Sequence, residues 1–423
     1  MKTPLRQRGV AALSVTLLLL FVLTLVLGFA SRNLLFEQRA SANQARSTQA
    51  FEAAEAGLAW AQAMLDSGTP IDADCEPSTT PGGVSFRDRF LTYDAATQRF
   101  TPRTWNNAGT ATPLSAACVL TDAGWSCSCP SAGQPALAAP PATGTHPAFA
   151  LHFVAAPRSG MVQLMATGCD HYAPACLPGL AGAATGGASA KAQVLLGLLP
   201  ALATVPIAAL TARGDITATG ALALANTAPD IGGLTAQAAG SIAMPLASLT
   251  TLPGMTAAAS LVAAEAQLAG TDTERLLTRF LGLDRNRWQQ LAGVQRPDCP
   301  ADCGAMLTAA IGPDAVHRLA WIAGDLSLDG PLTLGSAQQP VLLVVEGQVR
   351  LSGGVTIHGV VLTLAANWDT SGTANAQVNG ALIALGNVSG NGTPAISYDA
   401  AVLARLRGQL GSFVRVPGSW RDF

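Results

Sequence analysis

The chain has 423 residues, of which 49% are hydrophobic and 12% are charged, and its formal net charge is −2. This composition excludes a largely disordered chain, and the length excludes a single small disulfide-stapled module while allowing two or three domains. A sequence pI near 6.2 provides no general cationic field for phosphate groups, so we expect no nucleic-acid partner.

The N-terminus predicts a helix that spans a membrane. Residues 1–9 carry Lys2, Arg6 and Arg8 without an acidic residue, and the uncharged apolar run 10–30 follows them. At 1.5 Å per residue this run extends for about 31 Å, which is enough to cross the bilayer core. The apolar region of a cleaved secretory signal is only about 7–15 residues long, so an anchor with its basic end in the cytoplasm is favoured.

The helix is predicted to continue unbroken from the membrane into water. Residues 31–65 contain no proline and are rich in Ala, Glu, Gln and Arg. Gly68, with Pro70 after it, is expected to end the helix. One face carries an apolar stripe that we expect to pack against a globular head, with a coiled-coil stalk and a simple signal anchor as alternatives. The stripe consists of Phe51, Ala54, Leu58, Ala61 and Leu65.

These N-terminal residues resemble a known family. A basic leader ending in Arg8-Gly9, the sequence Val-Ala-Ala-Leu, a long apolar helix and the segment 49–58 are similar to the N-terminus of type IV pilus minor pilins, or pilus assembly proteins, of the PilX type. The resemblance covers residues 5–65. It implies cleavage after Gly9 by a prepilin peptidase, methylation of the new N-terminal Val10, and insertion of the helix into a pilus core. The implied assembly helix includes Ser14, Phe51, Glu52, Glu55, Leu58 and Leu65.

Ser14 is a departure from the pattern of major pilins. In that family the fifth residue of the mature chain is a glutamate, thought to pair with the N-terminal amine of a neighbouring subunit, whereas here the position is Ser14. A carboxylate buried in an apolar bundle is costly unless it is paired, so Ser14 avoids that cost and gives up the signal that sets register. This departure fits a low-copy subunit at the end of a filament.

The eight cysteines predict disulfides after export to the periplasm. Cys169 with Cys176, and Cys299 with Cys303, are spaced to close short loops. The other four allow three connectivities, which the sequence leaves open; they are Cys75, Cys118, Cys127 and Cys129. Structural zinc sites normally use Cys-x-x-Cys hooks, and none occurs here, so we expect no metal.

The fold class expected is α+β: a long transmembrane, pilin-type helix followed by a disulfide-bearing, mainly β head with a helical insertion. Short apolar segments between Gly, Asn and Asp turns predict strands. Their loose repetition favours a β-solenoid-like head, with an antiparallel sandwich as the alternative. The expected regions are a leader at 1–9, the helix at 10–66, a cysteine-bearing region at 67–180, strand sets at 181–255 and 319–398, the insertion at 256–318, and a C-terminal helix with an aromatic tail at 399–423.

No pattern in the chain predicts catalysis. The histidines are scattered, and neither a Gly-x-Ser-x-Gly elbow nor a phosphate-binding glycine loop in its strand-to-helix setting is present. Asp325, Asp329 and Glu346 are the carboxylates considered for a glycan-cleaving solenoid. Residues 213–215 spell Arg-Gly-Asp, a cell-adhesion tripeptide, but a charged tight turn explains them equally well. We therefore expect no enzyme activity and no cofactor.

The functional hypothesis is a minor pilin that enters a type IV pilus, at or near its tip, through the N-terminal helix and supports assembly or surface contact. Its location would be the inner membrane, single-pass with the head in the periplasm, and then the pilus on the cell surface. Its partners would be other major and minor pilins, the prepilin peptidase, and a surface receptor or tip adhesin. The alternatives are a membrane-anchored adhesin or glycan-active β-solenoid, and a pseudopilin of a type II secretion system.

Overall fold

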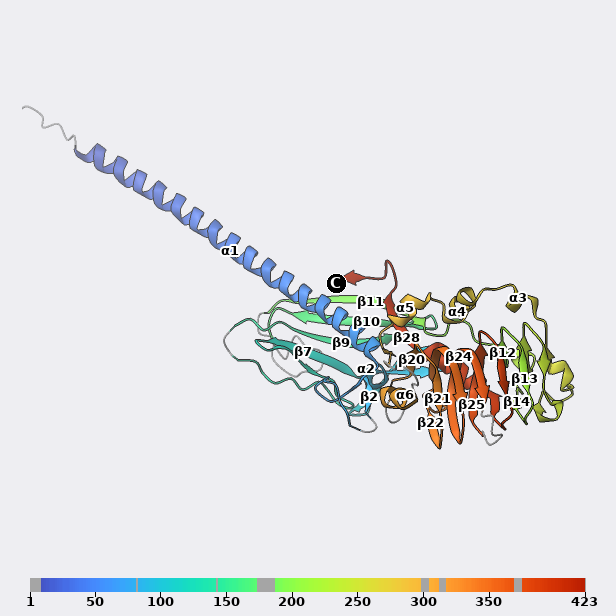
Figure 1. Ribbon diagram of the computed structural model, residues 1–423. Helices are drawn as coiled ribbons and strands as arrows, with labels where there is room; N and C mark the ends of the chain where they lie inside the picture. Colours follow the sequence, from blue (N-terminus) through green and yellow to red (C-terminus); the bar gives the residue numbers. More distant parts are fainter. Residues whose placement is uncertain are drawn as a thin grey trace, which may run out of the picture.

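A long helix leaves a two-part β head in the computed structural model, which describes residues 9–80, 83–141, 144–172, 187–297, 304–311, 317–368 and 375–422. Helix α1 (Gly9–Ser67) is unbroken, and Figure 1 shows its N-terminal half projecting away from the head. Its 59 residues span about 88 Å. The helix ends where the sequence indicated, because Gly68 adopts a left-handed φ of 65° and Pro70 begins the next strand.

The first part of the head is an antiparallel sheet on which the end of α1 lies. Its strand order is β28-β11-β10-β9-β7-β8, with β29 also pairing with β11. The bounds are β7 (Ser115–Thr121), β8 (Gly124–Ser128), β9 (Ala148–Ala155), β10 (Met161–Cys169), β11 (Ser189–Pro200), β28 (Gly411–Arg415) and β29 (Arg421–Asp422).

The antiparallel sheet takes strands from two places that the sequence analysis assigned elsewhere. β11 falls within the expected strand set 181–255, yet it pairs with β10 over nine residue pairs. The C-terminal region 399–423 was expected to be a helix with an aromatic tail, and strand β28 of this tail pairs beside β11 and buries Phe413 in the core. Antiparallel pairing joins strands of any sequence separation, so local pattern does not reveal these partners.

Small elements complete this part of the head. Helix α2 (Phe86–Phe90) is capped by Ser85, whose hydroxyl accepts from the amide of Asp88. Three two-stranded pairs surround it: β1 (Pro70–Ile71) with β2 (Val84–Ser85), β3 (Leu91–Asp94) with β4 (Arg99–Pro102), and β5 (Thr104–Asn107) with β6 (Thr110–Pro113).

The second part of the head is a stack of coils built from parallel strands. Every pair in this sheet is parallel, which confirms the expectation of a solenoid-like stack over an antiparallel sandwich for this part. The first set comprises β12 (Ala208–Ala212), β13 (Ile216–Ala218), β14 (Ala223–Ala225), β15 (Leu234–Ala238), β16 (Ile242–Ala243), β17 (Leu249–Thr250) and β18 (Leu261–Val262).

The second set of strands stacks on the first in an order different from that of the sequence. It comprises β19 (Val294–Gln295), β20 (Leu319–Ile322), β21 (Leu326–Leu328), β22 (Leu332–Leu334), β23 (Val341–Leu351), β24 (Val355–Trp368), β25 (Gln377–Ala384), β26 (Val388–Gly390) and β27 (Ala395–Tyr398). Along one face the spatial order is β19-β20-β23-β24-β25-β12-β15-β18. The last coil of the second set therefore lies on the first coil of the first set.

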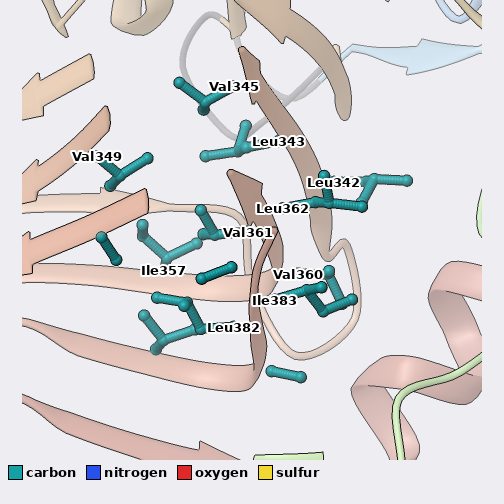
Figure 2. Close-up of a cluster of buried hydrophobic side chains, with 14 of the residues drawn as sticks. Leu342, Leu343, Val345, Val349, Ile357, Val360, Val361, Leu362, Leu382 and Ile383 are labelled. Atoms are coloured by element: carbon teal, nitrogen blue, oxygen red, sulfur yellow. The ribbon is translucent and has the colours of Figure 1, made fainter. Parts of the chain in front are cut away.

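Stacked apolar side chains fill the interior of the coils. Leu343 pairs with Val361, Val361 with Leu382, and Leu382 with Leu210, so equivalent positions form a continuous column. Figure 2 shows Leu343, Val361 and Leu382 within this buried cluster. Each coil covers the apolar face of its neighbour, which no coil could bury alone.

One face of the stack is covered on its outer side by helices. Its strands, such as Val341–Val345 of β23, are buried at every position, whereas β13 on another face alternates between buried and exposed residues. A parallel strand with both sides covered has a continuous apolar run, which explains the different sequence patterns. The helices are α3 (Ala266–Ala269), α4 (Thr273–Leu281), α5 (Arg285–Gln289), α6 (Gly304–Ile311) and α7 (Ala400–Gln409), with short 3-10 turns at Pro229–Ile231, Leu246–Ser248 and Ala258–Ser260.

The coils turn at corners held by side-chain hydrogen bonds between successive levels. The Asp325 carboxylate accepts from the amide of Gln348, Asn387 Oδ1 accepts from the amide of Asp215, and Asp215 accepts from the amide of Ser241. The Gly-Asp and Gly-Asn phrases in the sequence mark these corners.

A second corner requires glycine because the backbones come into direct contact. Gly359 and Gly380 are neighbours in adjacent coils, with φ of 150° and 144°. A Cβ on Gly359 would lie 1.8 Å from the Val341 carbonyl oxygen, and one on Gly380 would lie 2.0 Å from the Gly359 carbonyl oxygen. Only glycine fits this backbone approach.

We expect Gly359→Ala to lower the free energy of unfolding by about 3 kcal/mol, because the backbone must move to admit the methyl group. Urea unfolding measures the change. Gly354→Ala is the matched control in the same stack, since its Cβ would meet its nearest atom at 3.9 Å. Equal unfolding midpoints for the two variants would contradict the argument.

Candidate assembly interface

The N-terminal half of α1 presents an uncovered apolar surface. Every large apolar side chain from Leu13 to Phe29 is at least 46% exposed, and α1 is long and apolar enough to span a membrane. The hydroxyls of Thr16, Thr24 and Ser31 each donate to the carbonyl three residues earlier, at 3.0, 2.8 and 3.0 Å. These polar groups are thus satisfied within the helix, as hydrocarbon surroundings demand.

The C-terminal part of α1 is buried against the antiparallel sheet. The residues of one face have no exposed surface; they are Ala50, Ala54, Leu58, Ala61 and Leu65. The expected apolar stripe therefore packs on the head. Phe51 is half-buried, its ring 6.0 Å from that of Trp420, and Glu52 is exposed.

The helix lies directly on the backbone of strand β10. A Cβ on Gly168 would be 2.1 Å from the Ala50 carbonyl oxygen and 2.3 Å from the Ala54 nitrogen. The sequence analysis missed Gly168, although an isolated glycine inside a strand is a recognised signal of close backbone approach. Contact between glycine and alanine sets the distance between helix and sheet.

Aromatic rings fill the space beside this contact. Trp60 on α1 has its ring centroid 5.3 Å from Phe86 and 5.8 Å from Phe149, and Trp125 lies 4.7 Å from Phe149. Edge-to-face and tilted pairs at these distances stabilise the packing by about 0.5–1.5 kcal/mol each beyond the area they bury.

The C-terminal segment also forms hydrogen bonds with α1. Gln62 donates to the Phe413 carbonyl at 3.0 Å, and the Asp66 carboxylate accepts from the Phe413 amide at 2.6 Å. Glu55 accepts from the Trp420 indole and lies 3.8 Å from the Arg415 guanidinium. Burial raises the pKa of Asp66, while the Phe413 amide and the Arg87 charge act in the opposite direction. The sequence placed Glu55 on the helix but gave no sign of these partners.

Two disulfides fix the region between α1 and the sheet. Of the three connectivities left open, the structure has Cys75 bonded to Cys129 and Cys118 bonded to Cys127. The first links the loop after α1 to the end of β8, and the second joins neighbouring strands β7 and β8. Cys127 and Cys129, two residues apart on and beside β8, therefore belong to different disulfides.

The remaining cysteine predictions extend beyond the described residues. Cys169 is also disulfide-bonded. The predicted partner Cys176, and the predicted pair Cys299 and Cys303, lie outside the described residues.

For the processing site, Gly9 and Val10 are the first described residues of α1, and Ser14 is exposed on the helix.

The carboxylates considered for glycan cleavage have structural partners. Glu346 lies 2.8 Å from Arg285 and accepts from the Trp321 indole at 3.0 Å, joining the helical insertion to the stack. Asp325 holds a corner, and Asp329 accepts from the Gly330 amide. The three do not converge on a shared hydrogen-bond partner among these contacts.

The Arg-Gly-Asp segment is part of the solenoid framework. Asp215 accepts from both the amide and the hydroxyl of Ser241, at 2.7 and 2.8 Å, and Arg213 donates to the Thr271 carbonyl at 2.8 Å. The side chains of Arg213 and Asp215 are thus each bonded within the chain, to different residues. The bonds from Ser241 lower the pKa of Asp215 below its usual value.

The comparisons with known proteins concern mainly the helix. Residues 8–59 match the family model described as PilX N-terminal. None of the curated proteins matches the chain. Among solved structures, the competence-associated pilin ComZ from Thermus thermophilus aligns with 89% of this chain and 97% of its own, at 11% identity and a TM-score of 0.23. A score this low carries no argument about the fold or function of the head.

We expect Gly168→Val to separate α1 from the sheet, because the added carbons overlap the helix backbone, and to lower the free energy of unfolding by about 3 kcal/mol. Hydrogen exchange of the α1 amides from Ala54 to Leu65 should become faster. The control is Gly197→Ala on β11, where a Cβ would meet only Val416 at 3.6 Å. Unchanged exchange in the Gly168 variant would refute the contact.

We expect Asp215→Ala to lower the melting temperature at pH 7 and Asp215→Asn to lower it less, because an amide oxygen still accepts the corner hydrogen bonds, as Asn387 does, but carries no charge. Because the folded-state pKa of Asp215 is depressed, its carboxylate stabilises the fold above the unfolded pKa, and this contribution is lost as pH falls through the folded pKa. Melting curves from pH 7 to 3 should therefore bring the alanine variant and wild type together. A larger difference in melting temperature between wild type and Asp215→Ala at pH 3 than at pH 7 would contradict a stabilising role for the Asp215 carboxylate.

Proposed function

We propose, from the premise that this chain carries a PilX N-terminal domain at residues 8–59, that it is a minor pilin incorporated into a type IV pilus through α1, at or near the tip. The observation that carries the proposal is the uncovered apolar surface from Leu13 to Phe29. Such a surface must be buried by lipid or by other helices, and a pilus core provides helices.

The size of the head supports a position at the filament end. The described elements after Ser67 make up the two parts of the head, and the N-terminal half of α1 projects away from them (Figure 1). A head of this size is difficult to repeat along a narrow filament. Ser14 also supports a position at the filament end, because a serine has no carboxylate to pair with the N-terminal amine of a neighbouring subunit.

The two disulfides support export of the head. Cys75–Cys129 and Cys118–Cys127 are typical of proteins that fold in an oxidising compartment. We therefore propose a single-pass inner-membrane precursor with its head in the periplasm, which a prepilin peptidase cleaves after Gly9. Once in the pilus, it would contact other pilins through α1 and a surface receptor or tip adhesin through the head, supporting assembly or surface contact.

The test is the N-terminal mass of the protein recovered from sheared filaments. We expect a mature chain that begins with methylated Val10, and we expect Gly9→Leu to retain the leader and to be missing from filaments. Gly28→Ala, in the same helix, is the control because a Cβ there meets nothing within 4 Å. An uncleaved wild-type chain that never enters filaments would favour a membrane-anchored adhesin instead.

A further inference from the structure

Arg87 of helix α2 bonds to two distant segments of the chain, the end of α1 and the junction between α7 and β28. It is 8% exposed, and its guanidinium donates to the carbonyls of Leu65 at 2.9 Å, Gln409 at 2.6 Å and Gly411 at 2.8 Å. Leu65 lies in the last turn of α1, Gln409 ends α7, and Gly411 begins β28. One side chain therefore binds the ends of two helices and the start of a strand.

The chemistry of helix ends explains why a cation is suitable there. The last carbonyls of a helix have no partner within the helix and carry partial negative charge. Arg87 supplies hydrogen bonds and positive charge to α1 and α7 together, and its guanidinium also lies 3.6 Å from Asp66 and 4.9 Å from the centre of the Phe413 ring. Burial lowers its pKa to about 10, so the group is charged at neutral pH.

The position of Arg87 is the boundary between the two parts of the head. Leu65 and Phe413 belong to the apolar core of the antiparallel sheet, and Leu410 belongs to the core of the coils. A cavity of about 140 Å³ lies at this boundary, and its lining combines the charged residues Asp66, Arg87 and Arg318 with apolar ones such as Val84 and Leu319. Arg318, which precedes β20, lies 3.7 Å from Asp88 and donates to Gln409. Polar contacts thus connect the two parts at this point.

We propose that Arg87 is the positioning residue that fixes the direction of α1 relative to the coils. Its planar group meets one carbonyl at the end of α1 and two at the junction of α7 and β28, which the point charge of a lysine cannot do with the same geometry. If α1 is the segment held in a filament, as proposed above, Arg87 transmits force from that helix to the coils and keeps the angle between α1 and the coils fixed. α7 then acts as the connecting element, because it contacts β24 and β25 of the stack.

The test measures the distance between spin labels at Ser41, which is exposed on α1, and Thr333, which is exposed on β22, in the full-length protein in detergent. Labels attached through unnatural amino acids avoid the disulfide cysteines. We expect Arg87→Lys to broaden the distance distribution at least twofold relative to wild type. A second label pair at Thr217 and Thr333, within the coils, should keep its distribution and thereby show that the coils remain folded.

Arg89→Lys is the matched control. Arg89 lies on the same helix and also donates to three carbonyls, those of Ile71, Asp72 and Cys129, but all three belong to the disulfide-linked region. We expect its distribution between Ser41 and Thr333 to remain narrow. A narrow distribution in folded Arg87→Lys, or equal broadening in both variants, would overturn the proposal. The measurement needs no filament, so its result is independent of whether the chain is a pilin.

Discussion

The structure depends on one helix that meets two different environments. From Leu13 to Phe29 the large apolar side chains of α1 are uncovered, and from Ala50 to Leu65 one face of the same helix is buried on a sheet. A helix satisfies its own backbone hydrogen bonds, so it can exchange lipid for neighbouring helices while only its side-chain surroundings change. The head must then be attached firmly to the water-exposed end, and the close contact with Gly168 together with the bonds from the C-terminal segment provides that attachment.

The two parts of the head bury their cores in different ways. The antiparallel sheet uses α1 as the cover for one face, so the assembly helix is also a core element of the head. The coils bury one another, and the helical insertion with α7 covers their remaining apolar face. This division makes the boundary at Arg87 important, because the two apolar cores meet there beside a cavity that Arg87 lines.

Sequence analysis succeeded where the signal was local. The end of α1 at Gly68 follows from glycine and proline chemistry. It could not find the partners of Glu55 or the role of Arg87, since Trp420 and Gln409 are more than 300 residues away in the chain. Likewise the pairing of Cys75 with Cys129 was one of three equal choices on sequence alone.

The sequence by itself determined the long helix, its division into an apolar and an amphipathic half, and the presence of short strands separated by turns, because each of these depends on the periodicity and chemistry of neighbouring residues. Only the tertiary structure decided that β11 and the C-terminal tail join the antiparallel sheet, that the second strand set stacks on the beginning of the first, and that Arg87 connects the end of α1 to the junction of α7 and β28. These features depend on contacts between residues far apart in the chain, and such contacts are selected by the fit of whole surfaces, which no local pattern encodes.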